Sequence, residues 1–416
     1  SNLTFTFSAS SQTITFTSPS NKTYGDLAFT VAPTATSNLT VSLSSTTTSV
    51  CTVSSFTVTI VAPGTCTLTA DQSGNSSYAA ATQVSRSFTV AQAAQATLTI
   101  SATTTSAVSS GSAFSATPTF TTSTSGSGTG SVTYAVVSGG TATSCTLSNS
   151  SASATLTAAS AGTCLIAATK AADTNYLSAT SSNLTFTFTS ATHSITFNAP
   201  STTQFSAGSV SVSGTSSSGL TVAFSSGSTS VCTVSGTTVT FVTAGSCIIN
   251  ADQAGNTYYA AATQVQRTFT ISAGTQATLT ATASSNTAAY SGTAYSATPG
   301  LGTTGGSGNG AVTYSIVSGG SATSCALSSS AADATLTATS SGTCYIKATK
   351  ASDSNYNSAD STNLTFTFTK AVLATAVAPT LAVKSGSATT VTVNWTAVTN
   401  ATSILIKWYD SNGTNL

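Results

Sequence analysis

The sequence is poor in charge. Only 4% of its 416 residues are charged, against roughly 25% in an average soluble protein, and it contains no glutamate, no methionine and a single histidine. Its net charge of +1 gives no electrostatic basis for binding nucleic acid or an anionic membrane surface. No run of about 18 apolar residues occurs, so we expect no membrane span in this segment.

Serine, threonine, alanine and glycine dominate instead. Apolar residues still reach 40% and alternate with Thr and Ser in short runs bounded by Gly, Pro and Asn, which argues against disorder. In residues 183–188 (NLTFTF), Leu184, Phe186 and Phe188 face one side of a strand, and the threonines face the other. No stretch has a helical stripe, so the sequence predicts an all-β fold.

An internal repeat organises the chain. Residues 70–90 (ADQSGNSSYAAATQVSRSFTV) return as 251–271 (ADQAGNTYYAAATQVQRTFTI), and residues 168–189 return as 348–369. The offset is about 180 residues, and each such unit splits into two related halves, A and then B. Every half has the size of one Greek-key β-sandwich. We therefore expect a tandem array of β-sandwiches in the order A-B-A-B.

The expected domain boundaries follow these halves. They are residues 1–8 as the terminal strand of a preceding B-type module, 9–91 (A1), 92–190 (B1), 191–272 (A2), 273–371 (B2), and 372–416 as a different, partial domain.

Eight cysteines occur as one pair in each module. Each pair encloses a hairpin-like run, which can bring the two sulfurs together across neighbouring strands, and a disulfide closing such a loop stabilises a domain by roughly 3 kcal/mol. Metal binding is the alternative, but thiolate sites need four ligands and each module offers two. Disulfides indicate an oxidising, extracellular location. The expected pairs are Cys51–Cys66, Cys145–Cys164, Cys232–Cys247 and Cys325–Cys344.

The repeats, and the A halves best of all, resemble a known family. The pattern SVCTVSG, TVTFV, AGSC, ADQAGN and YYAAA (from 230 to 262) is similar to bacterial Ig-like domains, which occur in tandem in large secreted and cell-surface proteins. This resemblance covers about 9–371 and implies Ig-like sandwiches used as spacers or adhesive stalks, without catalytic residues. Residues 378–410, with Pro379, Trp395 and the pair Trp408 and Tyr409, resemble the start of a fibronectin type III domain.

The one histidine, His193, offers no catalytic base. Ser–His–Asp and Cys–His mechanisms need one. The matching position of the earlier copy is Gln12, and a base would not be expected to alternate with glutamine. We interpret His193 as an exposed residue of a first strand. The sequence therefore predicts no enzyme activity, no catalytic residue and no cofactor.

Each module also contains an Asp, an Asn and a Tyr in close succession. The structural interpretation is a turn in which Asx side chains bond the backbone and the tyrosine packs over the sandwich edge. The alternative is a weak calcium site at a module junction, although one carboxylate per module is few for an ion that takes six to eight oxygens. The candidates for calcium are Asp71, Asp173, Asp252 and Asp353.

The string SNLTFTF at residues 1–7 recurs at 182–188 and 362–368, where it closes a B module. One interpretation is that the chain is a stretch of a longer repetitive polypeptide. The other is strand donation, in which Leu3, Phe5 and Phe7 complete a neighbouring subunit's sheet and make the chain a filament subunit.

These features predict an extracellular structural array that forms a stalk, fibre or surface filament. Its expected partners are copies of itself or neighbouring modules of a longer chain, and not nucleic acid. The alternative is an adhesin that binds a glycan or protein ligand, which would require an exposed aromatic cluster. Tyr290, Tyr295 and Tyr345 of the last B module are the only hints of one. A third possibility is an appendage to an enzyme.

Overall fold

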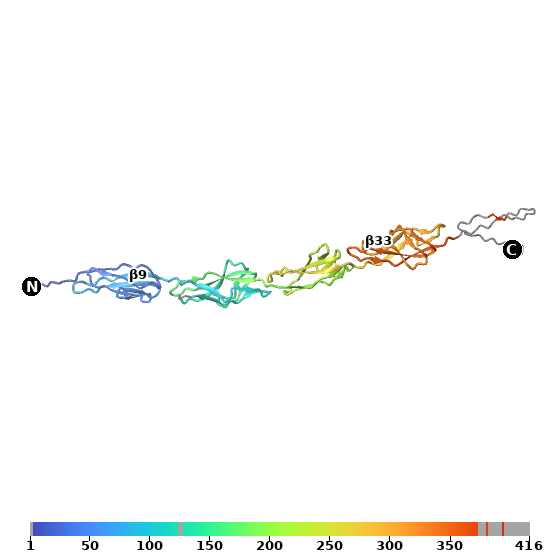
Figure 1. Ribbon diagram of the computed structural model, residues 1–416. Coiled ribbons are helices and arrows are strands. Elements are labelled where there is room, and N and C mark those ends of the chain that lie inside the picture. Colours follow the sequence, from blue (N-terminus) through green and yellow to red (C-terminus); the bar gives the residue numbers. More distant parts are fainter. Residues whose placement is uncertain (1–2, 124–127, 373–379, 382–392, 395–416) are drawn as a thin grey trace, which may run out of the picture. The chain divides into compact units, whose positions relative to one another are not determined.

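The structure is a computed structural model that describes residues 3–123, 128–372, 380–381 and 393–394. The chain divides into two compact units, the first comprising Ser1–Ser194, Ser217–Leu220 and Gln253–Ala262, and the second Ile195–Ser216, Thr221–Asp252 and Thr263–Leu416. Figure 1 colours the chain from blue to red and labels β9 of repeat A1 and β33 of repeat B2. In the described part of the chain, no helix is long and apolar enough to span a membrane.

Repeat A1 of the first unit forms three sheets. Its strands, in sheet order, are β2 (Lys22–Thr23), β9 (Val84–Ala91), β8 (Gly64–Asp71) and β5 (Ser42–Ser45), then β3 (Phe29–Thr30), β7 (Thr57–Ile60) and β6 (Cys51–Ser54), then β1 (Ile14–Thr15) and β4 (Thr34–Ala35).

Repeat B1 of the first unit is built in the same way, with one more short strand. Its strands are β11 (Ser106–Val108), β19 (Leu184–Thr189), β17 (Gly162–Lys170), β14 (Val132–Val137) and β18 (Ala179–Thr180), then β12 (Phe114–Ala116), β16 (Leu156–Ala158) and β15 (Thr146–Leu147), then β10 (Thr99–Ala102) and β13 (Phe120–Ser123).

The second unit repeats both arrangements. Repeat A2 contains β21 (Thr203–Gln204), β28 (Val265–Ser272), β27 (Gly245–Asp252) and β24 (Ala223–Ser226), then β22 (Ser209–Ser211), β26 (Thr238–Phe241) and β25 (Cys232–Ser235), then β20 (Ile195–Phe197) and β23 (Gly214–Ser216), and the short 3-10 helix η1 (Phe205–Ala207).

Repeat B2 follows the plan of B1. Its strands are β30 (Thr287–Ala289), β38 (Leu364–Thr369), β36 (Gly342–Lys350), β33 (Val312–Val317) and β37 (Ala359–Asp360), then β31 (Tyr295–Ala297), β35 (Leu336–Ala338) and β34 (Ala326–Leu327), then β29 (Leu279–Ala283) and β32 (Leu301–Gly305). Of the residues after 372, β39 (Thr380–Leu381) pairs antiparallel with β40 (Val393–Asn394). The fibronectin-like segment otherwise lies outside the described residues.

The last strand of each repeat occupies an interior place in its sheet. In B1, β19 pairs antiparallel with β17 on one side and parallel with the short β11 on the other. The alternation of Thr and Phe gives this strand one buried face, because Phe186 and Phe188 are 0% and 1% exposed. The all-β, A-B-A-B array of Ig-like sandwiches expected from the sequence is confirmed.

Candidate functional site

The A-type disulfides join the two main sheets of their repeat, and the B-type disulfides join the five-stranded sheet to the residue that directly precedes β15 or β34. Cys51 lies on β6 of the three-stranded sheet and Cys66 on β8 of the four-stranded sheet, with 5.7 Å between their Cα atoms. The sulfurs therefore meet across the core, and the expectation that they meet across neighbouring strands is wrong. The pairs in the structure are Cys51–Cys66, Cys145–Cys164, Cys232–Cys247 and Cys325–Cys344.

The two types of repeat bury their disulfides differently. Both cysteines of the A1 pair are 0% exposed. In B1, Cys164 is buried but Cys145 is only half-buried, and both line a shallow hollow of about 380 Å³ next to Gly139 and Gly140. The B-type disulfide is therefore the more accessible of the two to a dissolved reductant.

Every repeat contains a loop in which a characteristic turn is followed by a tyrosine. We call these segments the tyrosine loops: residues 72–79, 171–177, 253–260 and 351–357. In B1, Asp173 Oδ1 accepts hydrogen bonds from the backbone N–H groups of Asn175 (2.8 Å) and Tyr176 (2.9 Å). In A1, Asn75 Oδ1 does the same for Ser77 and Tyr78. The expected Asx turn is present, with an aspartate in B repeats and an asparagine in A repeats.

This geometry corrects the correspondence between the four aspartates. Asp71 precedes the turn and accepts a hydrogen bond from Gln83 Nε2 (2.8 Å), so the counterpart of Asp173 is Asn75. Asp252 is bonded in the same way to Gln264 (2.8 Å). The calcium candidates thus occupy two different positions: Asp71 and Asp252 precede the turn in the A repeats, and Asp173 and Asp353 form the turn in the B repeats. Within the described residues, no three His, Cys, Asp or Glu side chains are placed to hold a metal ion.

The B-type aspartates also hold the glycine-rich loop of their own repeat, of which residues 128–130 are described in B1 and residues 305–310 in B2. Asp353 Oδ2 accepts the backbone N–H of Asn309 at 2.5 Å, and a Cβ atom on Gly308 would lie 2.5 Å from the same oxygen. The hydrogen bond from Asn309, followed by that from Asn355, lowers the pKa of the Asp353 carboxyl. The pKa of Asp173 is lowered first by the Thr129 N–H and then by that of Asn175.

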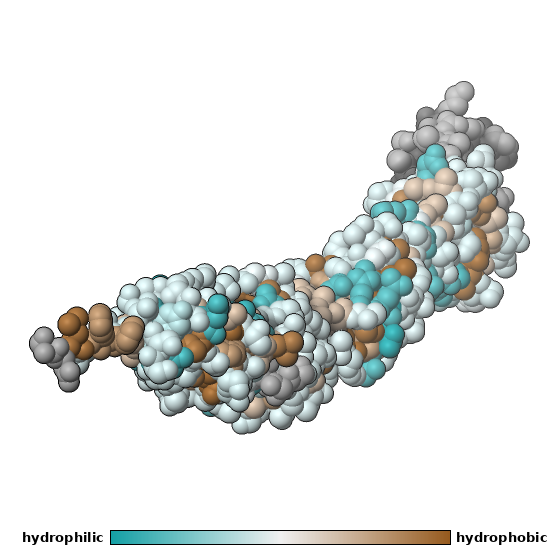
Figure 2. Space-filling view, turned by 90° about the vertical axis from the view of Figure 1, so that its left-hand side faces the viewer, coloured by the Kyte–Doolittle hydropathy of each residue, from teal (hydrophilic) through white to brown (hydrophobic). Residues whose placement is uncertain are grey.

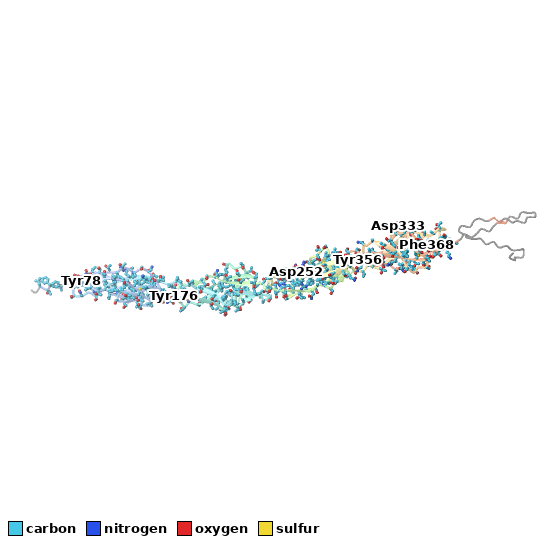
Figure 3. The ribbon with its side chains drawn as sticks, viewed as in Figure 1. Tyr78, Tyr176, Asp252, Asp333, Tyr356 and Phe368 are labelled. Carbon is cyan, nitrogen blue, oxygen red and sulfur yellow. A yellow bond between two sulfur atoms is a disulfide. The ribbon has the colours of Figure 1, made fainter. Side chains whose placement is uncertain are left out.

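The backbone of each tyrosine loop is fastened to the segment where the chain enters its repeat. Isolated parallel bridges join Ser10 to Tyr78, Ala93 to Tyr176, Ala191 to Tyr259 and Gly274 to Tyr356. Figure 3 labels Tyr78, Tyr176 and Tyr356, each at an end of its repeat.

The rings of Tyr176 and Tyr356 each contact the preceding repeat, a contact that the sequence interpretation did not include. In the first unit, Tyr176 packs edge-on against Tyr24, with 5.5 Å between ring centroids. In the second unit, Tyr356 packs edge-on against Phe205 at 5.6 Å. Such aromatic pairs add to the stability given by buried area. The sequence contained one signal for this contact: Tyr24 and Phe205 are both aromatic, lie in short polar segments and are 181 positions apart.

The A-type loop of residues 253–260 belongs to the first unit and packs on B1. The Tyr258 ring lies 5.5 Å from the Phe114 ring, and Tyr258 is among the residues that pack on the core of B1. His193 lies beside this loop, edge-on to Tyr259 at 5.4 Å. Both of its ring nitrogens are buried, and it precedes β20, so the interpretation of His193 as an exposed strand residue is wrong.

One polar contact distinguishes the two units. Asn355 Oδ1 accepts hydrogen bonds from Thr243 Oγ1 (2.7 Å) and from the backbone N–H of Ala244 (2.8 Å). Its counterpart Asn175 has a buried Oδ1 with no hydrogen-bond partner among the described residues. The counterparts of Thr243 and Ala244 are Ala62 and Pro63, which lack that hydroxyl and that N–H.

Of the three tyrosines proposed for an aromatic cluster, ring contacts among the described residues bring two together. Tyr290 packs on Tyr295 at 4.9 Å, and Tyr295 packs on Phe368 at 5.8 Å. Within the described residues, no ring contact joins Tyr345 to either tyrosine. Leu3, Phe5 and Phe7 lie outside any strand and are 79%, 77% and 98% exposed, so strand donation stays a prediction.

The fold and these contacts define the class of protein: a disulfide-linked tandem array of Ig-like β-sandwiches. No family model and no curated protein matches the sequence. Solved structures similar to it include the protocadherin GammaB4 extracellular domain, with TM-score 0.32, 13% identity, and coverage of 87% of this chain and 68% of that one.

Two further structures show similar values. The Sidekick-1 immunoglobulin domains 1–5 give TM-score 0.29 and 13% identity, covering 86% of this chain and 81% of that one. Domains 1–6 of the surface layer protein SbsC give TM-score 0.20 and 12% identity, covering 90% and 54%. With such TM-scores, none of these likenesses assigns a function or a partner to this chain.

Proposed function

We propose that this chain is an extracellular structural array that forms a stalk, fibre or surface filament. The disulfides support the location, because such bonds persist in oxidising compartments outside the cell. Each pair also restricts the unfolded chain of its own repeat, so that every sandwich resists unfolding by itself. We propose that the module boundaries are those predicted from the sequence. We also propose that the repeats belong to the bacterial Ig-like domains and that the segment after them is a fibronectin type III-like domain.

The observation that carries this proposal is the contact between successive repeats. In the first unit the B1 loop places Tyr176 on Tyr24, and in the second unit the B2 loop places Tyr356 on Phe205. Both loops are held in shape by an Asx turn, so their tyrosines are positioned before they meet the neighbouring repeat. Joints of this kind limit bending within a unit, which is what a stalk or fibre requires.

The surface chemistry is also suited to self-association. Figure 2 shows a face that is mostly of intermediate hydropathy, with small separate hydrophilic and hydrophobic areas. A net charge of +1 means that copies of the chain approach each other without like-charge repulsion. Self-association, or continuation with neighbouring modules, is therefore the partner relation that we propose.

Electron microscopy of negatively stained native material tests the proposal. We expect regular filaments, or stalks of constant length, decorated along their length by antibodies against the A-type repeats. The matched control is the same material after reduction and alkylation of the cysteines, which should lose its regular outline. Isolated particles that bend freely at every junction would contradict the proposal.

The alternative function is an adhesin for a glycan or a protein. The aromatic cluster proposed for it is that of B2, but Tyr290 packs on Tyr295, and Tyr295 packs on Phe368 of the repeat's own core. Both rings are half-buried and offer little free face for stacking on a sugar. Specific retention on a glycan array, abolished by Tyr345→Ala, would favour this alternative over the structural role.

A further inference from the structure

The end of B1 that receives the A-type tyrosine loop is formed by Ser109, Gly111 and Phe114. Phe114 begins β12 and is 1% exposed, with the Tyr258 ring tilted 42° against it. Gly111 has φ +90, and a Cβ atom there would lie 2.3 Å from the hydroxyl oxygen of Tyr259. Only glycine permits this close approach, so this end of B1 fits the tyrosine pair of an A-type loop. We call these three residues the B1 socket.

The same backbone occurs at the corresponding end of B2. The string SATP at 115–118 and 296–299 aligns Phe114 with Tyr295, which also begins its strand β31, and Ser109 with Tyr290. Ser109 N–H donates to Thr189 O at 2.8 Å, and Tyr290 N–H donates to the matching Thr369 O at 3.0 Å. The two turns therefore have the same path. They differ in the side chain at their first residue and, by one methyl group, at Ser112 and Thr293.

The side chain at the first residue changes what covers the aromatic residue below it. In B1, Ser109 is small and turns its hydroxyl to Ala113 O (3.2 Å), which leaves the face of Phe114 to Tyr258. In B2, the Tyr290 ring itself lies on Tyr295, at 4.9 Å and a tilt of 45°. These values are close to the 5.5 Å and 42° of Tyr258 on Phe114. Tyr290 thus packs on Tyr295, from within its own repeat, at nearly the distance and tilt at which Tyr258 of the A-type loop packs on Phe114 in B1.

We propose that the residue at the Ser109/Tyr290 position decides whether a B-type repeat accepts an A-type tyrosine loop. Serine leaves the socket open to the incoming tyrosine pair, and tyrosine closes it, because two rings cannot occupy one place against the same aromatic face. B2 is then a repeat whose end is covered by its own side chain, as terminal repeats of solenoid arrays are covered by modified faces. This inference rests on the proposed array function only in assuming that repeats dock end to end.

Exchanging the two residues in the full chain tests the inference, with hydroxyl-radical footprinting and peptide mass spectrometry as the measurement. Ser109→Tyr should raise the oxidation rate of Tyr258 severalfold, because the new ring displaces it. The matched control Ser109→Ala removes the hydroxyl without filling the socket and should leave Tyr258 protected. If Ser109→Tyr leaves the oxidation of Tyr258 unchanged, the socket is not closed by a tyrosine and the inference is wrong.

A second experiment does not depend on B1 tolerating a larger residue. A copy of residues 191–272 is inserted after residue 371, with Thr257→Ser in the copy so that its peptides differ in mass. Next to native Tyr290, the copy's tyrosine pair should oxidise severalfold faster than the original pair. With Tyr290→Ser, its oxidation should fall to the level of the original. Protection next to native Tyr290 would overturn the inference.

These outcomes are separable from the proposed function. Filaments in native material together with a protected copy beside Tyr290 would leave the structural role intact and refute the socket. If the protein forms no filaments, but the copy is exposed beside Tyr290 and protected in Tyr290→Ser, the socket is supported and the structural role is refuted.

Discussion

The unpaired amide oxygen of Asn175 should become bonded when two residues of A1 are exchanged for their A2 counterparts. In the second unit, Thr243 and Ala244 both donate to Asn355 Oδ1. The double substitution Ala62→Thr, Pro63→Ala supplies the same hydroxyl and the same backbone N–H at the corresponding positions of A1. Asn175 Oδ1 is buried without a partner in the described residues. We expect both new donors to bond this oxygen.

The size of the effect follows from the two bonds. Each intramolecular hydrogen bond contributes about 0.5–1.5 kcal/mol, so two contribute about 1–3 kcal/mol to keeping the contact closed. This corresponds to an equilibrium factor of about 5 to 150. The loss of the proline mainly changes the unfolded chain, and opening of this contact does not involve unfolding of A1. The full value is therefore expected in a measurement of local opening.

Hydrogen exchange of the backbone amide that the Pro63→Ala change introduces measures this opening in the double variant. The comparison is with the same variant carrying Asn175→Ala, in which both new donors lose their acceptor. The native reference is the amide of Ala244 with and without Asn355→Ala. We expect exchange of the introduced amide to be about 5 to 150 times slower when Asn175 is present. Equal rates in the two proteins would refute the assignment of Ala62 and Pro63 as the positions of the missing donors.

Three further predictions concern single repeats. Folding lowers the pKa values of Asp173 and Asp353, so their contribution to stability is complete above the ordinary value of 3.8 and disappears as pH falls through the lower folded value. The free energies of urea unfolding of the wild type and of Asp353→Asn should therefore converge at low pH, and a difference that stays constant with pH would contradict this. Timed reduction with alkylation and mass spectrometry should open Cys145–Cys164 before Cys51–Cys66, because Cys145 is only half-buried; the opposite order would show that burial does not control access. Gly308→Ala places a Cβ against the Asp353 carboxylate and should displace it, so an NMR titration should show the pKa of Asp353 rising. An unchanged titration would mean that the glycine-rich loop is not held by this carboxylate.

Local patterns were sufficient to predict the strands and the cysteine pairs. The alternation of Leu184, Phe186 and Phe188 with threonine allows only one face to be buried, and the structure buries that face. One cysteine pair in each repeat leaves a single pairing within a repeat, and the structure has it. Which sheets the disulfide joins was not predictable, because that depends on β8 leaving the hairpin of β6 and β7 for the opposite sheet.

The contacts that the tyrosine loops make with other repeats could not be predicted from the sequence, for a different physical reason. The Asx turn is local, and its residues could be proposed from composition, although Asp71 was matched to Asp173 in place of Asn75. Tyr258 and Phe114, in contrast, are brought together only when the loop of one repeat meets the end of another. No periodicity within a repeat contains that information.

The two kinds of repeat end explain why the sequence repeats over about 180 residues rather than over one sandwich. An A-type end presents a half-buried aromatic residue, Tyr24 or Phe205, to the single tyrosine of a B-type loop. The B1 end presents Phe114, above a glycine that admits the second tyrosine of an A-type loop. Each loop therefore fits the end of the other type, and a change at one end must be matched in the loop of the next repeat. Selection then acts on pairs of repeats, and an A-B period is the shortest that preserves both contacts.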